Sequence, residues 1–338
     1  MKAVGLYRYL PIAHPDSLVD LDQPIPTPSG RDLLVRVEAV SVNPVDTKVR
    51  APKDQVEAVP RILGWDAAGT VQAIGPDAIL FRPGDAVYYA GDITRSGSNA
   101  EFQLVDERLV ALKPTRLDVA QAAAFPLVTI TAYEALFDRM KIALDGAHRG
   151  ATLLILGGPG GVGSIMIQLA TLVGVTVIAT ASRPESNAWV KELGAAHVVD
   201  HRRPLRPQIE ALGLPFVDYI ANCVDTDAYW DVMADLIAPQ GTICTIVDHK
   251  GPLNHAMLKT KSVTHAWEFM FTRAKYRTPD MIEQHKLLTR VAAWIDSGHI
   301  KGIVRDTRGP ICAATLREAH ATMESGRMIG KLVLAGWP

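Results

Sequence analysis

The fold is decided by residues 153–164, which read LLILGGPGGVGS. Gly158, Gly160 and Gly163 match the pattern G-x-G-x-x-G between an apolar strand and a helical stretch, which is the context of a dinucleotide site. The first glycine permits the tight turn, the second lets backbone approach the pyrophosphate, and the third lets the helix pack closely on the strand. The helix N-terminus adds unpaired N–H groups and a favourable dipole for the anion. The expected cofactor-binding residues of this loop are Gly158, Gly160, Gly161, Val162 and Gly163; the alternative is a glycine-rich loop without a ligand.

The end of the next expected strand, residues 175–181, indicates which cofactor binds. An NAD site usually carries Asp or Glu about 20 residues after the fingerprint, where it holds the ribose 2′-hydroxyl. This strand instead ends in Ser182 and Arg183, with no acid before Glu185. Ser182 can donate to a 2′-phosphate and Arg183 can pair with it bidentately. The sequence therefore favours NADPH, although Arg183 could also be a solvated loop residue.

Three patterns along the chain predict the domain organisation. Short strands bounded by Gly, Pro and Asp run to about residue 125 and indicate a mostly β domain. Strands and helices then alternate from residue 151, which predicts a parallel sheet covered on both faces. Helices and strands alternate again in the last part. The expected α/β architecture is a doubly wound parallel sheet in residues 126–262, inserted between residues 1–125 and 263–338 of a second domain.

Composition excludes several classes of protein. A hydrophobic fraction of 48% is too high for a disordered chain of 338 residues. Lys and Arg number 35 against 36 Asp and Glu, a balance that argues against a nucleic-acid partner. Three cysteines cannot form a disulfide framework, which favours a reducing compartment. With neither a signal-peptide pattern nor an apolar run of ~20 residues, we expect a cytoplasmic protein without a membrane partner.

Several ordered segments carry a family resemblance that spans essentially the whole chain. They are Ser41–Lys48, Gly64–Gly69, Tyr88–Asp92, Ser98–Phe102, Pro126–Ala135 and His265–Arg273. The chain resembles the medium-chain dehydrogenase/reductase superfamily, in particular its quinone oxidoreductase-like branch and the group called zinc-type alcohol dehydrogenase-like proteins. The resemblance implies a GroES-like catalytic domain built from both chain ends, a Rossmann domain between them, a cleft separating the two, and a homodimer often joined along the cofactor sheets. The aromatic segment with Trp267 and Phe269 fits a core or dimer contact better than a substrate wall.

The resemblance also implies where a catalytic zinc would be bound. The three ligand positions hold Asn43, Trp65 and Leu127, and only the neighbouring Asp66 is of a type that zinc binds. The three cysteines fall on expected strands or near a helix start, as small buried side chains do. His197 and His201 are four residues apart but flank a strand, whereas two ligands at this spacing converge only on a helix. We therefore expect no metal.

A site without a Lewis acid must polarise its electrophile by hydrogen bonds, which suits conjugated acceptors. The resemblance places Asn43 at the nicotinamide end of the cleft, where its amide could donate to the ribose or substrate oxygen, or merely cap a turn before Pro44. Thr131 matches the family threonine that packs against the nicotinamide, or is a helix-start hydroxyl bonded to backbone. Lys48, where many quinone reductases have tyrosine, could orient substrate or donate a proton, or pair with Asp46 or face solvent.

The expected function is zinc-independent, NADPH-dependent hydride transfer to a small-molecule quinone or α,β-unsaturated carbonyl. One alternative is an NADPH-dependent alcohol, aldehyde or enoyl-thioester reductase. Another is a noncatalytic NADPH-binding protein, crystallin-like or RNA-binding. The balanced charge favours no RNA-binding face, although folding could cluster Arg202, Arg203 and Arg206.

Overall fold

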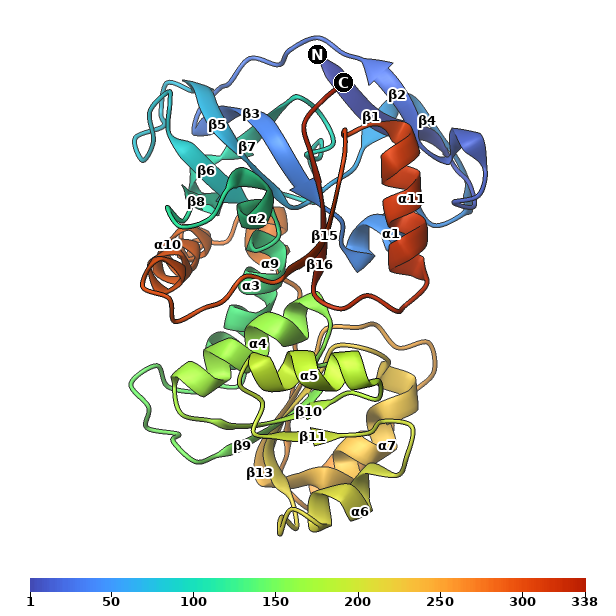
Figure 1. Cartoon of the computed structure of the whole chain (residues 1–338), viewed down its shortest axis with the longest axis vertical. Helices are drawn as coiled ribbons and strands as arrows, with labels where there is room; N and C mark the ends of the chain where they lie inside the picture. Colours follow the sequence, from blue (N-terminus) through green and yellow to red (C-terminus); the bar gives the residue numbers. More distant parts are fainter. The chain divides into compact units, whose positions relative to one another are not determined.

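Both ends of the chain build one unit and the middle builds another (Figure 1). The computed structural model describes all residues from Met1 to Pro338. Unit 1 comprises Met1–Leu127 and Phe271–Pro338, and unit 2 comprises Val128–Met270. The first boundary between the units follows Leu127, two residues after the boundary expected from the sequence. The second follows Met270 rather than residue 262, because the strand Thr264–Trp267 hydrogen-bonds to the sheet of unit 2.

A parallel six-stranded sheet forms the centre of unit 2 and confirms the expected fold class. Its order is β11-β10-β9-β12-β13-β14, the 3-2-1-4-5-6 order of dinucleotide-binding domains. All residues of β9 are buried, as expected for a parallel strand covered on both faces. The strands are β9 (Thr152–Leu156), β10 (Thr176–Thr180), β11 (His197–Val199), β12 (Val217–Asn222), β13 (Ile237–Thr245) and β14 (Thr264–Trp267).

The helices of unit 2 connect these strands. Figure 1 draws α4 and α5 beside each other, where Trp189 Nε1 of α5 donates to Ser164 Oγ of α4 at 2.9 Å. Trp230 and Met233 of α7 pack into a core with residues of β9, β10, β12 and β13. A π-helix, Glu134–Arg139, continues α3. The helices are α3 (Pro126–Tyr133), which begins in unit 1, α4 (Gly161–Leu172), α5 (Pro184–Glu192), α6 (Leu205–Glu210), α7 (Thr226–Leu236) and α8 (Ala256–Lys259).

Two sheets form unit 1. The larger has the order β15-β16-β3-β5-β6-β8, with β7 also paired to β3, and the smaller has the order β2-β1-β4. Near the C-terminus β16 pairs antiparallel with β3, so that Val333 lies opposite Ser41. The strands are β1 (Lys2–Tyr9), β2 (Val19–Asp22), β3 (Asp32–Ser41), β4 (Lys53–Ile62), β5 (Ala67–Ile74), β6 (Ala86–Tyr89), β7 (Phe102–Asp106), β8 (Val110–Leu112), β15 (Val304–Arg308) and β16 (Lys331–Ala335).

Helices cover parts of these sheets. Figure 1 shows α1 and α11 side by side, where the buried Arg50 forms an ion pair with Glu324. Tyr88 of β6 donates to the carbonyl of Leu288 in α10 at 2.7 Å. The α-helices are α1 (Pro44–Arg50), α2 (Val119–Ala123), α9 (Thr272–Tyr276), α10 (Glu283–Asp296) and α11 (Ala313–Glu324); short 3₁₀ turns cover Pro15–Ser17 and Glu107–Leu109. None of the helices in the structure combines the length and apolar character needed to cross a bilayer.

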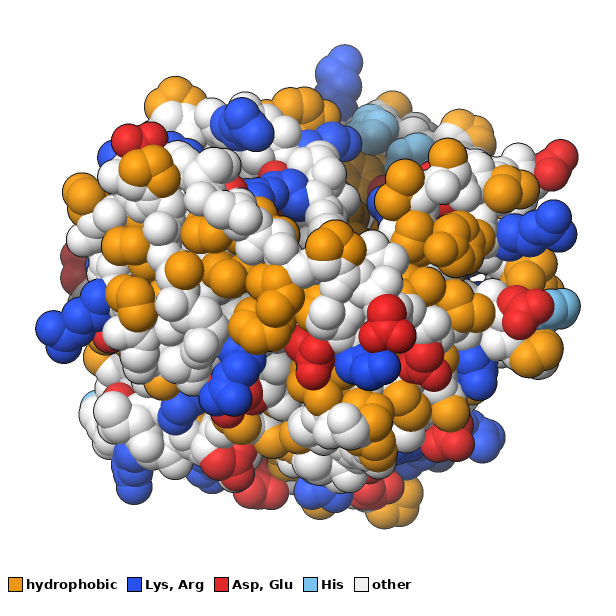
Figure 2. Space-filling view, turned by 90° about the horizontal axis from the view of Figure 1, so that it is seen from above, with side chains coloured by type: hydrophobic (Ala, Val, Ile, Leu, Met, Phe, Trp, Pro, Cys, Tyr) orange, Lys and Arg blue, Asp and Glu red, His pale blue; other side chains and the backbone are white.

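The visible surface carries charges of both signs. On the face in Figure 2, Lys and Arg side chains alternate with Asp and Glu, and no large patch of one sign forms. This distribution matches the near-equal numbers of acidic and basic residues in the sequence. All three cysteines are free thiols.

Candidate functional site

The glycine loop of unit 2 lies between β9 and α4, as the sequence predicts. A Cβ atom on Gly158 would lie 2.9 Å from the Cβ of Ala179, and one on Gly163 would lie 2.5 Å from two backbone oxygens. Both positions therefore require glycine for packing within the domain. The positive φ of the turn falls on Gly157, at 91°, rather than on Gly158. A Cβ on Gly160 would meet only the Gly157 oxygen, at 3.5 Å, which is an ordinary van der Waals contact, so the protein leaves room for a small group there.

The N-terminus of α4 has the features of an anion-binding helix end. Gly160 is the N-cap of the helix and supplies no side-chain cap. The N–H groups of the first helical turn have no carbonyl partner within the helix, and they share the positive end of its dipole. The expected loop residues thus fit a dinucleotide pyrophosphate, which would bind against backbone N–H groups beside the open Cβ position of Gly160.

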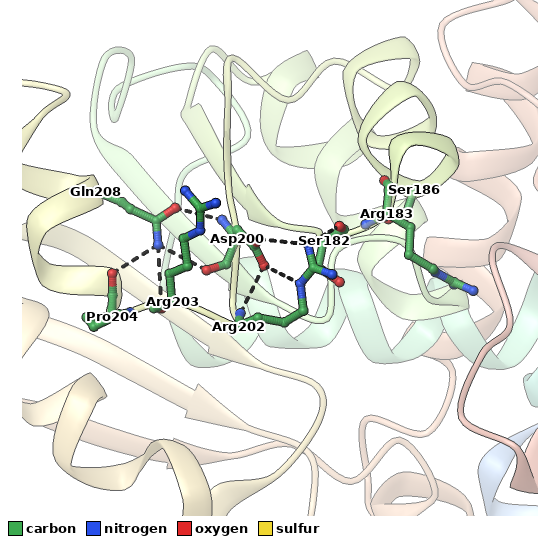
Figure 3. A network of polar contacts seen from close by, with 8 residues as sticks. All are labelled: Ser182, Arg183, Ser186, Asp200, Arg202, Arg203, Pro204 and Gln208. Carbon is green, nitrogen blue, oxygen red and sulfur yellow. Dashed lines mark hydrogen bonds and ion pairs between the residues drawn. The ribbon is translucent and has the colours of Figure 1, made fainter.

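Ser182 and Arg183 follow the end of β10 after one intervening residue, at the carboxyl edge of the sheet (Figure 3). Arg183 is exposed and forms the N-cap of α5. Its backbone is held by Ser186, whose Oγ accepts from Arg183 N at 3.1 Å and donates to Arg183 O at 2.9 Å. In Figure 3 the side chain of Arg183 points away from the neighbouring Asp200. The structure therefore places Arg183 on the exposed loop after β10, the segment from which the sequence predicts contact with the 2′-substituent of the ribose.

Arg202 is a candidate cofactor residue, although the sequence suggested for it only a possible place in a basic cluster with Arg203 and Arg206. Its guanidinium binds both carboxylate oxygens of Asp200, at 3.0 and 2.9 Å, and donates to the Ser182 carbonyl at 2.7 Å (Figure 3). The hydrogen bonds from Arg202 lower the pKa of Asp200 to about 2. Asp200 is therefore a carboxylate whose charge Arg202 offsets. The register that places Thr180 opposite Val199 brings these two loops together, and no local pattern reveals that pairing. Arg206 does not join this network, because its Nε forms an ion pair with Asp235 Oδ2 at 2.8 Å.

Asn43 of unit 1 does not have the free amide that we expected. Its side chain is 1% exposed, and Nδ2 donates to Asp66 Oδ2 at 2.9 Å and to the Ser41 carbonyl at 3.2 Å. Its Oδ1 accepts from Lys331 Nζ at 2.5 Å. Because an amide nitrogen has only two hydrogens, none is left to donate to a ribose or a substrate oxygen. The correction is that Asn43 belongs to a buried polar cluster.

The other two catalytic candidates lie in different units. Lys48 is exposed on α1, as in the alternative that has it face solvent, and the alternative pairing with Asp46 does not form. Asp46 is buried and instead accepts the N–H of Asn43 at 2.6 Å, and its burial raises its pKa to about 7. Thr131 is buried in the part of α3 that belongs to unit 2, and it lies five residues after the first residue of the helix, Pro126, so it is not at the helix start.

Lys331 is the centre of the cluster that contains Asn43. Its ammonium lies 2.9 Å from Asp66 Oδ2, and both side chains are buried, at 2% and 0% exposure. Asp66 Oδ1 accepts the backbone N–H of Leu127 at 2.8 Å. Burial raises the pKa of Asp66, and the Lys331 ammonium opposes that rise. No local sequence pattern indicates this partner, because Lys331 is 265 residues from Asp66.

A second buried cluster lies in unit 2, and the sequence did not predict it either. Arg139 of the π-helix binds Glu268 Oε2 through Nε at 2.8 Å and approaches Glu134 Oε2 at 3.7 Å. Both carboxyl groups are fully buried. Burial and the neighbouring Glu134 raise the pKa of Glu268 to about 9. Glu268 directly follows β14, at the same sheet edge as the glycine loop, and π-helices often occur at functional sites.

Comparison with known proteins agrees with this fold. Residues 29–115 match the family model of the alcohol dehydrogenase GroES-like domain, and residues 193–334 match that of zinc-binding dehydrogenases. A zinc-type alcohol dehydrogenase-like protein of Staphylococcus aureus is 44% identical over 335 residues, which cover 99% of each chain. The 2-methylene-furan-3-one reductase of Solanum lycopersicum is 30% identical over 92% of this chain and 73% of its own length.

Solved structures agree as well. A crystal structure from Rhizobium etli, provisionally described as a zinc-dependent alcohol dehydrogenase, superposes with a TM-score of 0.95 and 49% identity, covering 100% of this chain and 98% of its own. A mycobacterial protein in complex with NADPH superposes with a TM-score of 0.84 and 28% identity, covering 99% of this chain and 100% of its own.

A GroES-like domain that carries an inserted six-stranded dinucleotide-binding domain defines an oxidoreductase of the medium-chain dehydrogenase/reductase superfamily. Within that superfamily, the chain belongs to the zinc-type alcohol dehydrogenase-like family. The resemblance inferred from the sequence is thereby confirmed.

The residues present do not fit the zinc that these family names imply. Zinc sites in proteins use Cys, His and carboxylate ligands. Around Asp66 the structure instead places the Asn43 amide and the Lys331 ammonium, and Leu127 contributes only a backbone N–H. Trp65 donates to the Asp92 carbonyl at 3.3 Å and packs edge-on against Phe271. No group of three or more His, Cys, Asp or Glu side chains in the structure could hold a metal ion.

Proposed function

We propose that the protein is a zinc-independent NADPH-dependent reductase that transfers hydride to a quinone or an α,β-unsaturated carbonyl. The observation that carries this proposal is the carboxyl edge of the unit 2 sheet, where an open glycine loop lies on the same edge as the Ser182–Arg183 loop. The NADPH complex of the mycobacterial protein and the enone-type name of the tomato reductase support it. The non-zinc character of the Asp66 cluster suits acceptors that need no Lewis acid.

The residues of unit 2 would hold the cofactor in three places. Backbone N–H groups of Gly161, Val162 and Gly163 would bind the pyrophosphate, as helix N-termini do for anions. Ser182 and Arg183 would bind the 2′-phosphate, and Arg202 adds positive charge beside Ser182. Thr131 would pack against the nicotinamide. Bound NADPH would supply the hydride.

Lys48 is the proposed group that orients the acceptor or gives it a proton. It is exposed, and Asp46 does not occupy its ammonium. Replacing Lys48 by Met should lower kcat with the acceptor while leaving the KM for NADPH unchanged, since the cofactor residues lie in unit 2. An unchanged kcat would remove Lys48 from the proposal.

The cofactor assignment is tested by substituting the arginines near Ser182. Arg183→Ala and Arg202→Met should each lower the NADPH/NADH ratio of kcat/KM by about 10- to 100-fold, because a hydrogen bond to a charged group contributes about 1.5–3 kcal/mol. Arg206→Met is the matched control, because Arg206 binds Asp235 instead. A ratio that is unchanged in both variants contradicts the 2′-phosphate assignment.

The acceptor class is tested by steady-state turnover of the purified protein with NADPH. We expect reduction of 9,10-phenanthrenequinone or of an aliphatic enone. Turnover with simple aldehydes alone would favour the alcohol or aldehyde reductase alternative. Tight NADPH binding without turnover of any acceptor would favour a noncatalytic protein. The RNA-binding form of that alternative has less support, because the 35 Lys and Arg residues are matched by 36 Asp and Glu residues.

We propose a homodimer as the working assembly. β14 is an edge strand that pairs only with β13, and an open strand edge readily pairs with another strand. Trp267 at its end and the nearby Phe269 are each 44% exposed. Light scattering after gel filtration should give twice the chain mass of 36.6 kDa. A monomer at micromolar concentration would contradict this assembly.

A further inference from the structure

The Asp66 cluster contains its own cation. Lys331 is the first residue of β16, which pairs with β3, and its side chain extends to the residues that follow β3. Its Nζ contacts three oxygens: Asn43 Oδ1 at 2.5 Å, Asp66 Oδ2 at 2.9 Å and the Val42 carbonyl at 3.3 Å. An ammonium has three donors and no acceptor. These three contacts therefore use all of its hydrogen-bonding capacity.

The remaining atoms of the cluster are oriented to serve that cation. Asn43 directs its oxygen to Lys331 and its nitrogen to Asp66, so it bridges the cation and the anion. Asp66 receives three donors: Lys331, the Asn43 amide and the Leu127 N–H. Every polar side-chain atom of Lys331, Asn43 and Asp66 has a partner. A divalent cation at this place would have to displace the ammonium, and it would find only oxygen ligands.

We propose that the ammonium of Lys331 is the resident cation of this site, a role that the family names assign to zinc. It neutralises the buried Asp66 carboxylate and fixes the amide of Asn43. The end of β3 and the start of α1 thus acquire their order from a side chain encoded near the C-terminus. The folded protein needs no metal at this place. This inference is independent of the acceptor and cofactor proposed above.

Removing the ammonium should have a specific consequence. Lys331→Met keeps a long unbranched side chain but leaves the Asp66 carboxylate buried without a cation, which is strongly destabilising. Adding Asp66→Asn removes that uncompensated charge. The double variant should therefore be more stable than the Lys331→Met single variant, although one residue more has been changed. A merely space-filling role for Lys331 predicts no such recovery.

The experiment measures metal content and thermal unfolding of the full chain. The protein is expressed with added zinc, purified without chelator and assayed by plasma mass spectrometry; we expect far less than one zinc per chain and a melting temperature unchanged by EDTA. Lys331→Met should lower the melting temperature by about 6–20 °C. Lys2→Met is the matched control, because Lys2 forms an exposed ion pair with Asp22 at 3.0 Å; its shift should be below about 4 °C.

Three results would overturn the proposal. One is stoichiometric zinc that EDTA removes with loss of stability. Another is a Lys331→Met variant as stable as the native protein. The third is a double variant no more stable than Lys331→Met. Should Lys331→Met fail to fold, the double variant decides alone: recovery of a folded protein supports the resident cation, and failure to recover contradicts it.

Discussion

Two buried clusters, one in each unit, contain the same set of charges but hold them differently. The unit 1 cluster has Asp46, Asp66 and the ammonium of Lys331. The unit 2 cluster has two carboxyl groups, Glu134 and Glu268, and the guanidinium of Arg139. Each has two acids for one base. Taking charges out of water is costly, so each cluster needs a way to reduce its excess negative charge.

The two clusters solve this problem by different means. In unit 1, backbone N–H groups of Leu127 and Asn43 donate to Asp66 and Asp46, and the cation is fully enclosed. In unit 2 the carboxyl of Glu268 faces that of Glu134, and the side chain of Arg139 is 29% exposed. Burial and Glu134 raise the pKa of Glu268 to about 9, against about 7 for Asp46. Unit 1 therefore maintains a paired charge, whereas unit 2 retains a proton at neutral pH.

Among the pH-dependent effects, the largest is expected from removing the cation of unit 2. Arg139→Met should cost about 3–5 kcal/mol at pH 9, because breaking a buried pair leaves an uncompensated charge. The cost should be smaller at pH 6, where the carboxyl groups can bind protons. Urea unfolding followed by tryptophan fluorescence at both pH values measures this difference. An equal loss at both would mean that the cluster does not exchange protons in this range.

Glu268→Gln should remove the pH dependence of the same cluster. A folded-state pKa of about 9, above the ordinary 4.5, means that the folded protein binds a proton that the unfolded chain does not hold between these values. Native stability therefore falls as pH rises from about 4.5 to 9, and the variant should lack that contribution. Relative to native, the variant should gain on the order of 1–3 kcal/mol between pH 5 and 9. If the unfolding free energies of the two proteins changed in parallel with pH, Glu268 would not retain a proton in the folded state.

Asp46→Asn tests the corresponding acid of unit 1 and should have a smaller effect. The folded-state pKa of Asp46 is about 7, so the native protein loses stability as the pH rises from about 4 to about 7 and not above that range. The N–H of Asn43 and the Lys331 charge favour the carboxylate and limit the effect to about 1–2 kcal/mol. The measurement is the melting temperature at pH 5 and pH 8. A variant that loses as much stability as native between these values would show that Asp46 does not titrate there.

The exposed pair Arg202–Asp200 should have the smallest effect on stability. Solvent and salt screen an exposed ion pair, so Arg202→Met should leave the melting temperature close to native. The same variant should raise the KM for NADPH. A large fall in melting temperature with unchanged KM would make Arg202 a structural residue instead of a cofactor residue.

Local patterns were sufficient for the cofactor domain. The apolar run of β9, the glycine spacing and the helical start at Gly161 are all adjacent in the chain, so the sequence predicted them together. They were not sufficient for the side chains of the candidate site. Arg202 reaches Ser182 only because β11 lies beside β10. The two partners of Arg139 lie on the π-helix and after β14, and neither segment has a motif that pairs them.

Asn43 shows the division between sequence and structure most clearly. The sequence by itself determined the fold class, the dinucleotide loop and the absence of cysteine or histidine from the expected metal positions, because each depends on residue type or on spacing within one segment. Only the tertiary structure decided that the Asn43 amide binds Asp66 and Lys331. Lys331 is 288 residues from Asn43 in the sequence. The physical reason is the antiparallel pairing of β16 with β3, which brings an ammonium from the far end of the chain into a buried acidic cluster.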